Sequence, residues 1–192
     1  EQPRPRLCRA TWQQRLKLAL DVATGMEHMH AAGIMHRDLK SMNVMLAAAV
    51  SGPEDIPLAK VGDFGLARCV DSSVEKLTQQ VGSWHYMAPE VFDFNDEESY
   101  DEKVDVYSFA MVLYELIMEE MPFGELSYAG TLRLGMRVIQ GERPTVDRDF
   151  QEEIPRRLRC LMERCWSGDP RARPSFGSAS TELLELSGAV VN

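Results

Sequence analysis

Five polar residues that could do chemistry together lie in the stretch IMHRDLKSMNVML, residues 34–46: His36, Arg37, Asp38, Lys40 and Asn43. Apolar residues flank them on both sides. A plain surface loop does not need such flanks, and a plain core strand would not tolerate so many charges. Polar groups held rigidly at the edge of a core are typical of catalytic loops.

The segment before this stretch is predicted to be a helix over residues 11–31, because its apolar residues recur at steps of three and four. Thr11 is a candidate N-cap and Gly33 a candidate stop. After the stretch, NVMLA and AKVGDF predict two short strands that pair as a hairpin. The residues between them include glycine, two prolines and two acids, and are predicted to form a loop.

The most apolar segment of the chain is VDVYSFAMVLYELIM, residues 104–118. It is apolar on almost every side and too short to span a bilayer, so it predicts a helix at the centre of a core. Asp105, near its start, could cap this helix or brace a neighbouring backbone. Residues 68–90 show no sustained periodicity. Further helices are predicted over residues 127–140, 154–166 and 175–187.

The 192 residues have a net charge of −9, which argues against nucleic acid or an anionic membrane as the main partner. No apolar run is long enough to predict a membrane span, and no signal peptide is recognisable at the start, which we interpret as an internal one. Four cysteines without a C-x-x-C pair suit a reducing cytosol, so we expect a cytoplasmic protein. A metal site at His28, His30 and His36 is not expected, since no partner ligand has zinc spacing.

Three motifs occur in a telling order along the chain. HRDLKSMN matches H-R-D-L-x-x-x-N, DFG follows at residues 63–65, and APE follows at residues 88–90. DVYSFAMVLYEL and CWSGDPRARPSF add a buried helix and a C-terminal Cys-Trp, Asp-Pro and Arg-Pro pattern. Over essentially its whole length the chain resembles the eukaryotic protein kinase superfamily. Within that superfamily it most resembles the tyrosine-kinase-like group of serine/threonine kinases.

The resemblance implies a mainly α (α+β) fold, the kinase large lobe, with helices around a buried central helix and a small β-hairpin near the catalytic loop. Residues 1–192 would be this C-terminal lobe alone, with a catalytic loop at 34–46, an activation segment at 63–90 and a helical subdomain at 91–187. The sequence contains no G-x-G-x-x-G loop and no V-A-I-K-like strand. The β-rich small lobe is therefore expected to be absent from this chain, which we expect to be a fragment inactive by itself.

The resemblance also implies roles for the polar residues, with ATP and Mg²⁺ as cofactors. Asp38 would accept the proton of the substrate hydroxyl, and Lys40 would reach the transferring phosphoryl group. Asn43 and Asp63 would hold magnesium, and Met45 would lie beneath the adenine. The alternatives are a turn pair that satisfies local backbone for Asp38 and Asn43, and a simple strand core for Met45.

Regulation would act through Arg37, which by resemblance pairs with a phosphate in the irregular segment 68–82. The alternative for Arg37 is a structural salt bridge. Ser83 would hydrogen-bond Asp38 and Lys40 across the substrate cleft, or be an ordinary loop serine. The candidate phosphorylation sites are Ser72, Ser73 and Thr78.

Other family positions imply architecture rather than chemistry. His36 and Phe64 would stack in a hydrophobic column that links the two lobes. Glu90 would pair with Arg173 and tie the activation segment to the C-terminal helices. Asp105 would hold the backbone of the catalytic loop.

The resemblance implies a protein kinase that transfers the γ-phosphoryl of Mg-ATP to protein hydroxyls in signal transduction. Lys40 and the stretch GSWHYMAPE resemble serine/threonine kinases, although the C-terminal pattern is shared with tyrosine kinases, so dual or tyrosine specificity stays open. The expected partners are a protein substrate and the small lobe of the same domain. A different hypothesis is a non-catalytic, kinase-like interaction module. The retained catalytic residues favour the enzyme, and the missing lobe favours the module.

Overall fold

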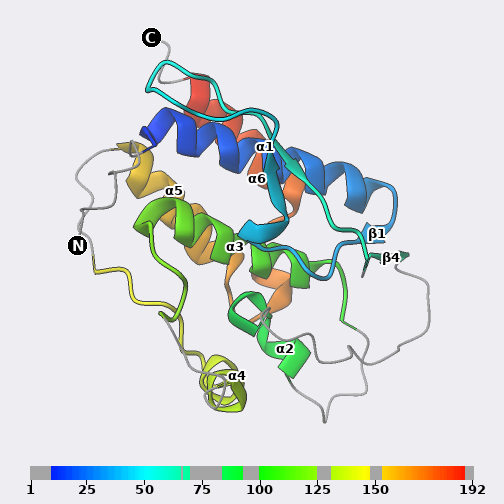
Figure 1. Cartoon of the computed structure of the whole chain (residues 1–192). Helices are drawn as coiled ribbons and strands as arrows, with labels where there is room; N and C mark the ends of the chain where they lie inside the picture. The colour runs from blue at the N-terminus through cyan, green and yellow to red at the C-terminus, as the bar shows by residue number, and fades with distance from the viewer. Residues whose placement is uncertain are drawn as a thin grey trace, which may run out of the picture.

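The computed structural model describes residues 10–65, 67–69, 84–92, 100–124, 131–147 and 153–188. These residues form a mainly helical body with two small antiparallel strand pairs beside it (Figure 1). Among the described helices, none has the length and apolar character that crossing a bilayer requires.

The first helix, α1 (Trp12–Ala31), begins one residue after the predicted start, with Thr11 as its N-cap. Thr11 and Gln14 form a capping box: the Thr11 hydroxyl accepts from the Gln14 N–H at 3.2 Å, and the Gln14 side chain accepts from the Thr11 N–H at 2.9 Å. The helix ends before Gly33, whose φ of 70° lies in the left-handed region that favours glycine. Both predicted ends of this helix are therefore confirmed.

Two strand pairs frame the catalytic-loop sequence. The predicted hairpin is confirmed: β2 (Val44–Leu46) pairs antiparallel with β3 (Ala59–Val61), with Met45 opposite Lys60. A short 3-10 helix, η1 (Ser41–Asn43), leads into β2. The second pair was not predicted: β1 (Ile34–Met35) pairs antiparallel with β4 (Arg68–Cys69).

The long loop between β2 and β3 is fastened to α1. Gln14 donates from its amide to the carbonyls of Gly52 and Asp55, at 2.8 and 2.9 Å. The Asp55 carboxylate in turn accepts from the N–H groups of Ser51 and Gly52, which lower its pKa. At the end of the loop, Asp21 of α1 accepts from the Ala59 N–H at 3.0 Å. These bonds hold the hairpin, and with it the end of β3, against α1.

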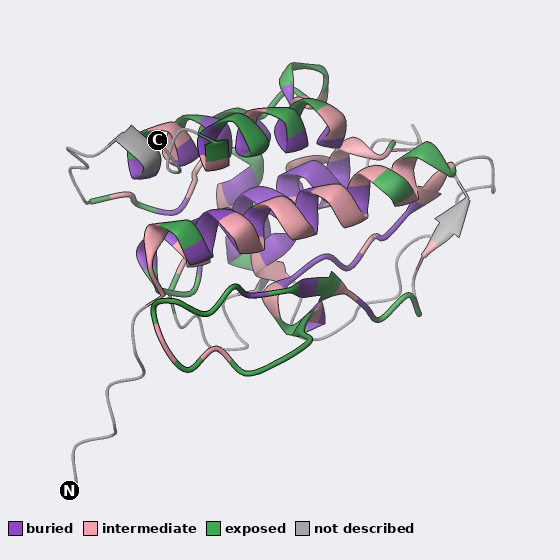
Figure 2. Cartoon of the chain, turned by 90° about the horizontal axis from the view of Figure 1, so that it is seen from above, coloured by how far each residue is buried: buried purple, intermediate pink, exposed green. Residues whose placement is uncertain are grey.

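The core lies around α3 (Lys103–Met118), the predicted central helix. Its side chains are buried on almost every side, and it packs against α1 and α5 (Glu153–Cys165). The last helix, α6 (Phe176–Gly188), packs along α1. Figure 2 shows the buried residues gathered where these helices face one another. The helices predicted at 154–166 and 175–187 are confirmed within a residue at each end.

The remaining described elements are η2 (Trp84–Tyr86), α2 (Pro89–Phe92), α4 (Thr131–Ile139) and η4 (Pro170–Ala172). Of these, η2 and η4 contact α3, and α4 packs on η2 and α2, which lie near the APE motif. Gly135 of α4 touches the Phe92 ring so closely that an added Cβ would lie 2.5 Å from it, which accounts for a glycine inside a helix. The helix predicted at 127–140 is seen from residue 131, and its expected start lies outside the described residues.

Candidate active site

The backbone of the catalytic loop is held by the fully buried carboxylate of Asp105. One oxygen accepts from the N–H of His36 and the other from the N–H of Arg37, each at 2.8 Å. α3 has Glu102 at its N-cap position, with no hydrogen bond from that side chain. Of the two roles considered for Asp105, the structure shows the brace and not the cap.

A third group reaches the same carboxylate, and sequence reasoning missed it. Nε2 of His30, near the end of α1, lies 2.9 Å from Oδ2 of Asp105, and its ring packs edge-on against Phe176. The signal was present, because His30 occupies a position on the apolar stripe of α1. A histidine on a core-facing stripe needs a buried polar partner.

The loop chain turns sharply at Arg37, whose φ of 67° lies in the left-handed region. Asp63, the first residue of DFG, has a φ of 59°. Such backbone costs an ordinary residue of the order of 1 kcal/mol or more, and it persists where surrounding bonds over-determine it. For Arg37 the hydrogen bond from its N–H to Asp105 is one such bond.

Three of the predicted site residues meet at the Asp38 carboxylate. Lys40 donates from Nζ to Oδ2 at 2.7 Å, and Asn43 donates from Nδ2 to the same oxygen at 3.1 Å. The Asn43 amide also donates to the Asp38 backbone carbonyl at 2.8 Å. All three residues are buried. The local turn contact and the carboxylate contact therefore exist together, and they fix one orientation of the Asp38 carboxylate.

His36 links this loop to DFG. Its Nδ1 accepts from the Asp38 N–H at 3.3 Å, so Nε2 is the nitrogen that donates to the Gly62 carbonyl, at 3.0 Å. The ring is buried and lies 5.7 Å from the Phe64 ring, centroid to centroid. The structure thus places His36 and Phe64 together, and adds hydrogen bonds that packing alone did not predict.

Asn43 and Asp63 are brought close by the hairpin. The Gly62 N–H donates to the Asn43 carbonyl at 2.8 Å, so DFG begins beside Asn43. The Asn43 Nδ2 is used by Asp38, which leaves the amide oxygen as its ligand atom, and Asp63 is exposed. Amide and carboxylate oxygens are the hard donors that magnesium prefers. The donor set therefore fits a magnesium ion.

Several large apolar side chains in and near the hairpin are exposed. Met45 has 58% of its surface exposed, so a simple strand core is the wrong interpretation of this residue. Met42, Leu46 and Phe64 are exposed as well, at 73, 49 and 55%. Gly62 is covered by the Met45 side chain, whose methyl carbon would lie 2.6 Å from an added Cβ.

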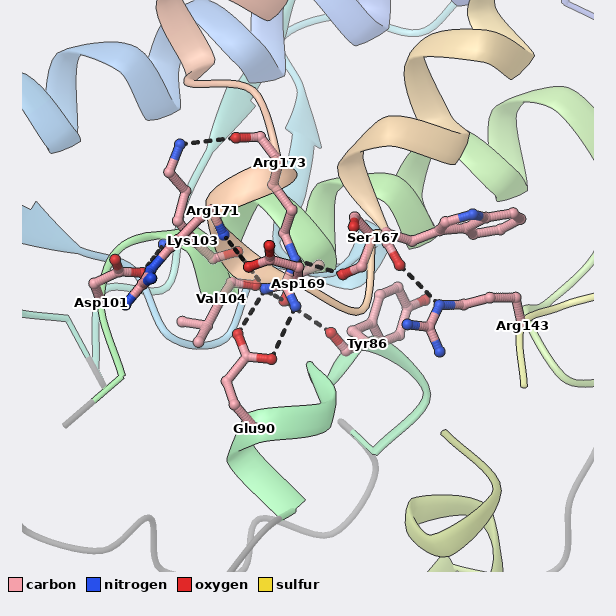
Figure 3. A network of polar contacts seen from close by, with 12 residues as sticks. Tyr86, Glu90, Asp101, Lys103, Val104, Arg143, Ser167, Asp169, Arg171 and Arg173 are labelled. Atoms are coloured by element: carbon pink, nitrogen blue, oxygen red, sulfur yellow. Dashed lines mark hydrogen bonds and ion pairs between the residues drawn. The ribbon is translucent and has the colours of Figure 1, made fainter. Parts of the chain in front are cut away.

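Glu90, the last residue of the expected activation segment, is joined to the C-terminal part of the chain by Arg173 (Figure 3). Arg173 donates to both carboxylate oxygens, at 2.6 and 2.9 Å, and to the Ser167 and Lys103 carbonyls, at 2.9 and 3.0 Å. Lys103 returns a bond from Nζ to the Arg173 carbonyl at 2.9 Å. The guanidinium is fully buried and lies 5.2 Å from the centre of the Tyr107 ring.

Tyr86 fastens the same segment to the catalytic loop, and sequence reasoning missed it. Its hydroxyl donates to Glu115 of α3 at 2.6 Å and lies 3.1 Å from the Ser41 hydroxyl. Burial first, and then the bond to Glu115, raises the pKa of Tyr86 above its ordinary value. Glu115 was a usable signal, because a carboxylate inside an apolar helix requires a buried donor.

The expected phosphate-dependent residues are only partly visible. Ser72, Ser73, Thr78 and Ser83 lie outside the described residues. Arg37 is described, and its guanidinium donates from Nη2 to the Tyr100 hydroxyl at 2.8 Å. Within the described parts of the chain no carboxylate forms an ion pair with Arg37, so the salt bridge considered for it is not seen there.

Comparison with known proteins agrees with this geometry. The family model described as "Protein kinase domain" matches residues 7–184. The chain belongs to this family. It is 39% identical over 183 residues to "Probable serine/threonine-protein kinase roco7" of Dictyostelium discoideum. The aligned residues cover 92% of this chain and 6% of that protein.

Two further relatives show the same relation. "Serine/threonine-protein kinase STY17" of Arabidopsis thaliana is 36% identical over 175 residues, 91% of this chain and 27% of that protein. A "Probable LIM domain-containing serine/threonine-protein kinase" of Dictyostelium discoideum is 38% identical over 173 residues, 90% of this chain and 24% of that protein. The chain thus spans about a quarter or less of the length of these relatives.

Proposed function

We propose that this chain is the large lobe of a serine/threonine-protein kinase domain, which transfers the γ-phosphoryl of ATP to protein serine and threonine hydroxyls in signal transduction. The observation that supports this best is the Asp38 carboxylate, held at 2.7 Å by Lys40 and at 3.1 Å by Asn43. The names of the relatives support the serine/threonine specificity.

Phosphoryl transfer needs positioning and charge neutralisation more than covalent chemistry from the protein. The Asp38 carboxylate orients the substrate hydroxyl and accepts its proton as the oxygen attacks the γ-phosphorus, whose bond to the bridging oxygen breaks to release ADP. Lys40, which contacts Asp38 directly, supplies positive charge beside the transferring group. Asn43 and Asp63 would hold magnesium through their oxygens, and the ion would supply positive charge to the phosphate oxygens of the nucleotide.

A second lobe is needed to complete this site. The sequence contains no glycine-rich loop for the phosphates and no strand lysine. The exposed side chains of Met45 and Phe64 are apolar surface that a nucleotide and a small lobe would cover. We therefore expect the chain to act with the small lobe of the same kinase domain and to be inactive without it.

Control of this activity would involve the activation segment. A phosphate on Ser72, Ser73 or Thr78 would pair with the Arg37 guanidinium, because a phosphoryl group adds nearly two negative charges and several strong acceptors. Ser83 would contact Asp38 and Lys40. The Glu90–Arg173 pair would hold the end of the segment while its middle is reorganised.

The test uses the full-length protein that contains this chain. Asp38→Asn should lower turnover at least about a hundredfold, the usual scale for a residue in acid–base catalysis, with nucleotide affinity little changed. Asp147→Asn, at an exposed position of the described chain, is the matched control and should keep the parent rate. Phosphate transfer by Asp38→Asn at the parent rate contradicts the assignment. A parent protein that transfers no phosphate to any protein substrate favours the interaction module.

A further inference from the structure

Arg37 is held at both ends by one short segment, residues 100–105. Its backbone N–H donates to Oδ1 of Asp105 at 2.8 Å, and its guanidinium donates to the Tyr100 hydroxyl, also at 2.8 Å. Asp105 belongs to the first turn of α3, and Tyr100 lies just before that helix. The position of the Arg37 side chain therefore depends on the same segment that braces the loop backbone.

The contact with Tyr100 involves the ring as well as the hydroxyl. The guanidinium carbon of Arg37 lies 5.7 Å from the centre of the Tyr100 ring, within the range of a cation–π interaction. Nε of Arg37 is buried and has no hydrogen-bond partner among the described residues. The Arg37 residue as a whole is only half-buried, and Tyr100 provides two contacts to the guanidinium beside the buried Nε.

The contacts between Arg37 and Tyr100, which we call the clamp, also lie near residues 87–91. A cavity of about 20 Å³ is lined by Arg37 and Tyr100 together with Met87, Ala88 and Val91. That volume has room for one water molecule. The guanidinium has five N–H donors, and Tyr100 receives one of them. The remaining donors can still meet a phosphate, so the phenol and a phosphate are not mutually exclusive partners.

We propose that Tyr100 is a positioning residue that keeps Arg37 in place when the 68–82 segment has no phosphate, and so maintains a basal activity. This inference rests on the proposed kinase function. A neutral phenol is a weaker partner for a guanidinium than a phosphate, because the phosphate adds charge attraction and can accept two parallel hydrogen bonds. Phosphorylation would therefore still stimulate, but from a basal level that Tyr100 sets.

The kinetic test compares Tyr100→Phe with the parent in the full-length protein, before and after phosphatase treatment. The variant keeps the ring and loses the hydrogen bond. The phosphatase-treated variant should lose about fivefold in turnover, the effect of one net hydrogen bond, while the form phosphorylated in the 68–82 segment changes less than about twofold, because the charge-assisted bonds to the phosphate are the stronger ones. Where mass spectrometry finds no phosphate there, the untreated variant should show the fivefold loss. An equal loss in both forms, or no loss, overturns the proposal.

Hydrogen exchange of the 34–46 segment tests the clamp without relying on activity. Tyr100→Phe should speed exchange of the amides of residues 36–38. Tyr114→Phe is the matched control, because it removes a phenol hydrogen bond of 3.0 Å to the Thr145 carbonyl, and it should leave that segment unchanged. A parent protein that transfers no phosphate refutes the proposed function, but the hydrogen-exchange experiment still tests the contact between Arg37 and Tyr100. Unchanged hydrogen exchange of residues 36–38 in Tyr100→Phe overturns the positioning role of Tyr100.

Discussion

The carboxylate of Glu90 receives two hydrogen bonds from the guanidinium of Arg173, at 2.6 Å from Nη1 and 2.9 Å from Nη2. The Arg173 side chain has no exposed surface, whereas that of Glu90 is 21% exposed. Removing one partner of such a pair leaves a buried charge without its counter-ion. Glu90→Ala should therefore destabilise the domain by about 3 kcal/mol, the lower end of the range for buried pairs.

Thermal unfolding of the full-length protein measures this loss. The control is Glu163→Ala, which removes the exposed pair between Arg159 and Glu163 on α5. An i,i+4 pair of that kind contributes only about 0.3–0.5 kcal/mol. Equal shifts in melting temperature for the two variants would show that burial of Arg173 does not govern the effect.

Asp105→Asn should loosen the catalytic loop. The substitution keeps the shape but leaves one oxygen acceptor for the N–H groups of His36 and Arg37, and it turns an NH₂ donor toward one of them. Hydrogen bonds to charged groups contribute about 1.5–3 kcal/mol, so we expect a loss of stability of that order. Phosphate transfer should fall at the same time. A variant with parent stability and parent turnover would contradict the brace.

Tyr107 should make the protein less stable at alkaline pH. Burial raises its pKa to about 12 from an ordinary value of 10, against the smaller opposing effects of Arg143 and Arg173. The unfolded chain loses the phenol proton first, so stability is complete below pH 10 and falls as pH rises toward 12. The total loss is about 2–3 kcal/mol.

Tyr107→Phe isolates this contribution. The difference between parent and variant in the free energy of unfolding should be independent of pH below 10 and should shift in favour of the variant between pH 10 and 12. The Tyr107 hydroxyl is buried without a hydrogen-bond partner among the described residues, so the substitution should cost little at neutral pH. A pH-independent difference up to pH 12 would refute the raised pKa.

Two cysteines of α5 should react very differently with an alkylating reagent. Cys165 is buried, and burial raises the pKa of its thiol to about 12, whereas Cys160 is exposed. The thiolate is the reactive form, so at pH 8 iodoacetamide should label Cys160 and leave Cys165 unmodified until the protein unfolds. Mass spectrometry of the labelled peptides checks this. Similar labelling of both cysteines in the folded protein would contradict the packing of α5.

Residues 1–192 alone should bind Mg·ATP only weakly. The proposed site offers Asn43 and Asp63 as magnesium ligands and Met45 as one apolar wall, whereas magnesium relies on several substrate oxygens held in place. Isothermal titration calorimetry should show no micromolar binding. Micromolar binding together with phosphate transfer would show that residues 1–192 are sufficient.

The local features of this protein were predictable from the sequence. The start of α1 follows from Thr11, the predicted N-cap, and its end from Gly33. The hairpin of β2 and β3 follows from two short strand patterns around a loop. The chemistry-bearing residues at 34–46 lie within one short stretch, so their types and spacing indicated a catalytic loop, and the order of the three motifs gave the resemblance that implies phosphoryl transfer. Apart from the order of the motifs, these signals act between residues that are near neighbours along the chain.

The tertiary structure decided which distant residues hold that stretch in place. Asp105 could have capped α3 or braced a backbone, and only the fold brings it to the His36 and Arg37 amides, 69 and 68 residues away. Tyr100, His30 and Tyr86 gained their roles in the same way. The pair of β1 and β4 involves two residues in each strand, too few to leave a periodic pattern. Such contacts depend on the direction and burial of side chains after the helices have packed. The periodicity of the sequence predicts which face of an element is apolar, but not which distant residue a polar side chain will contact.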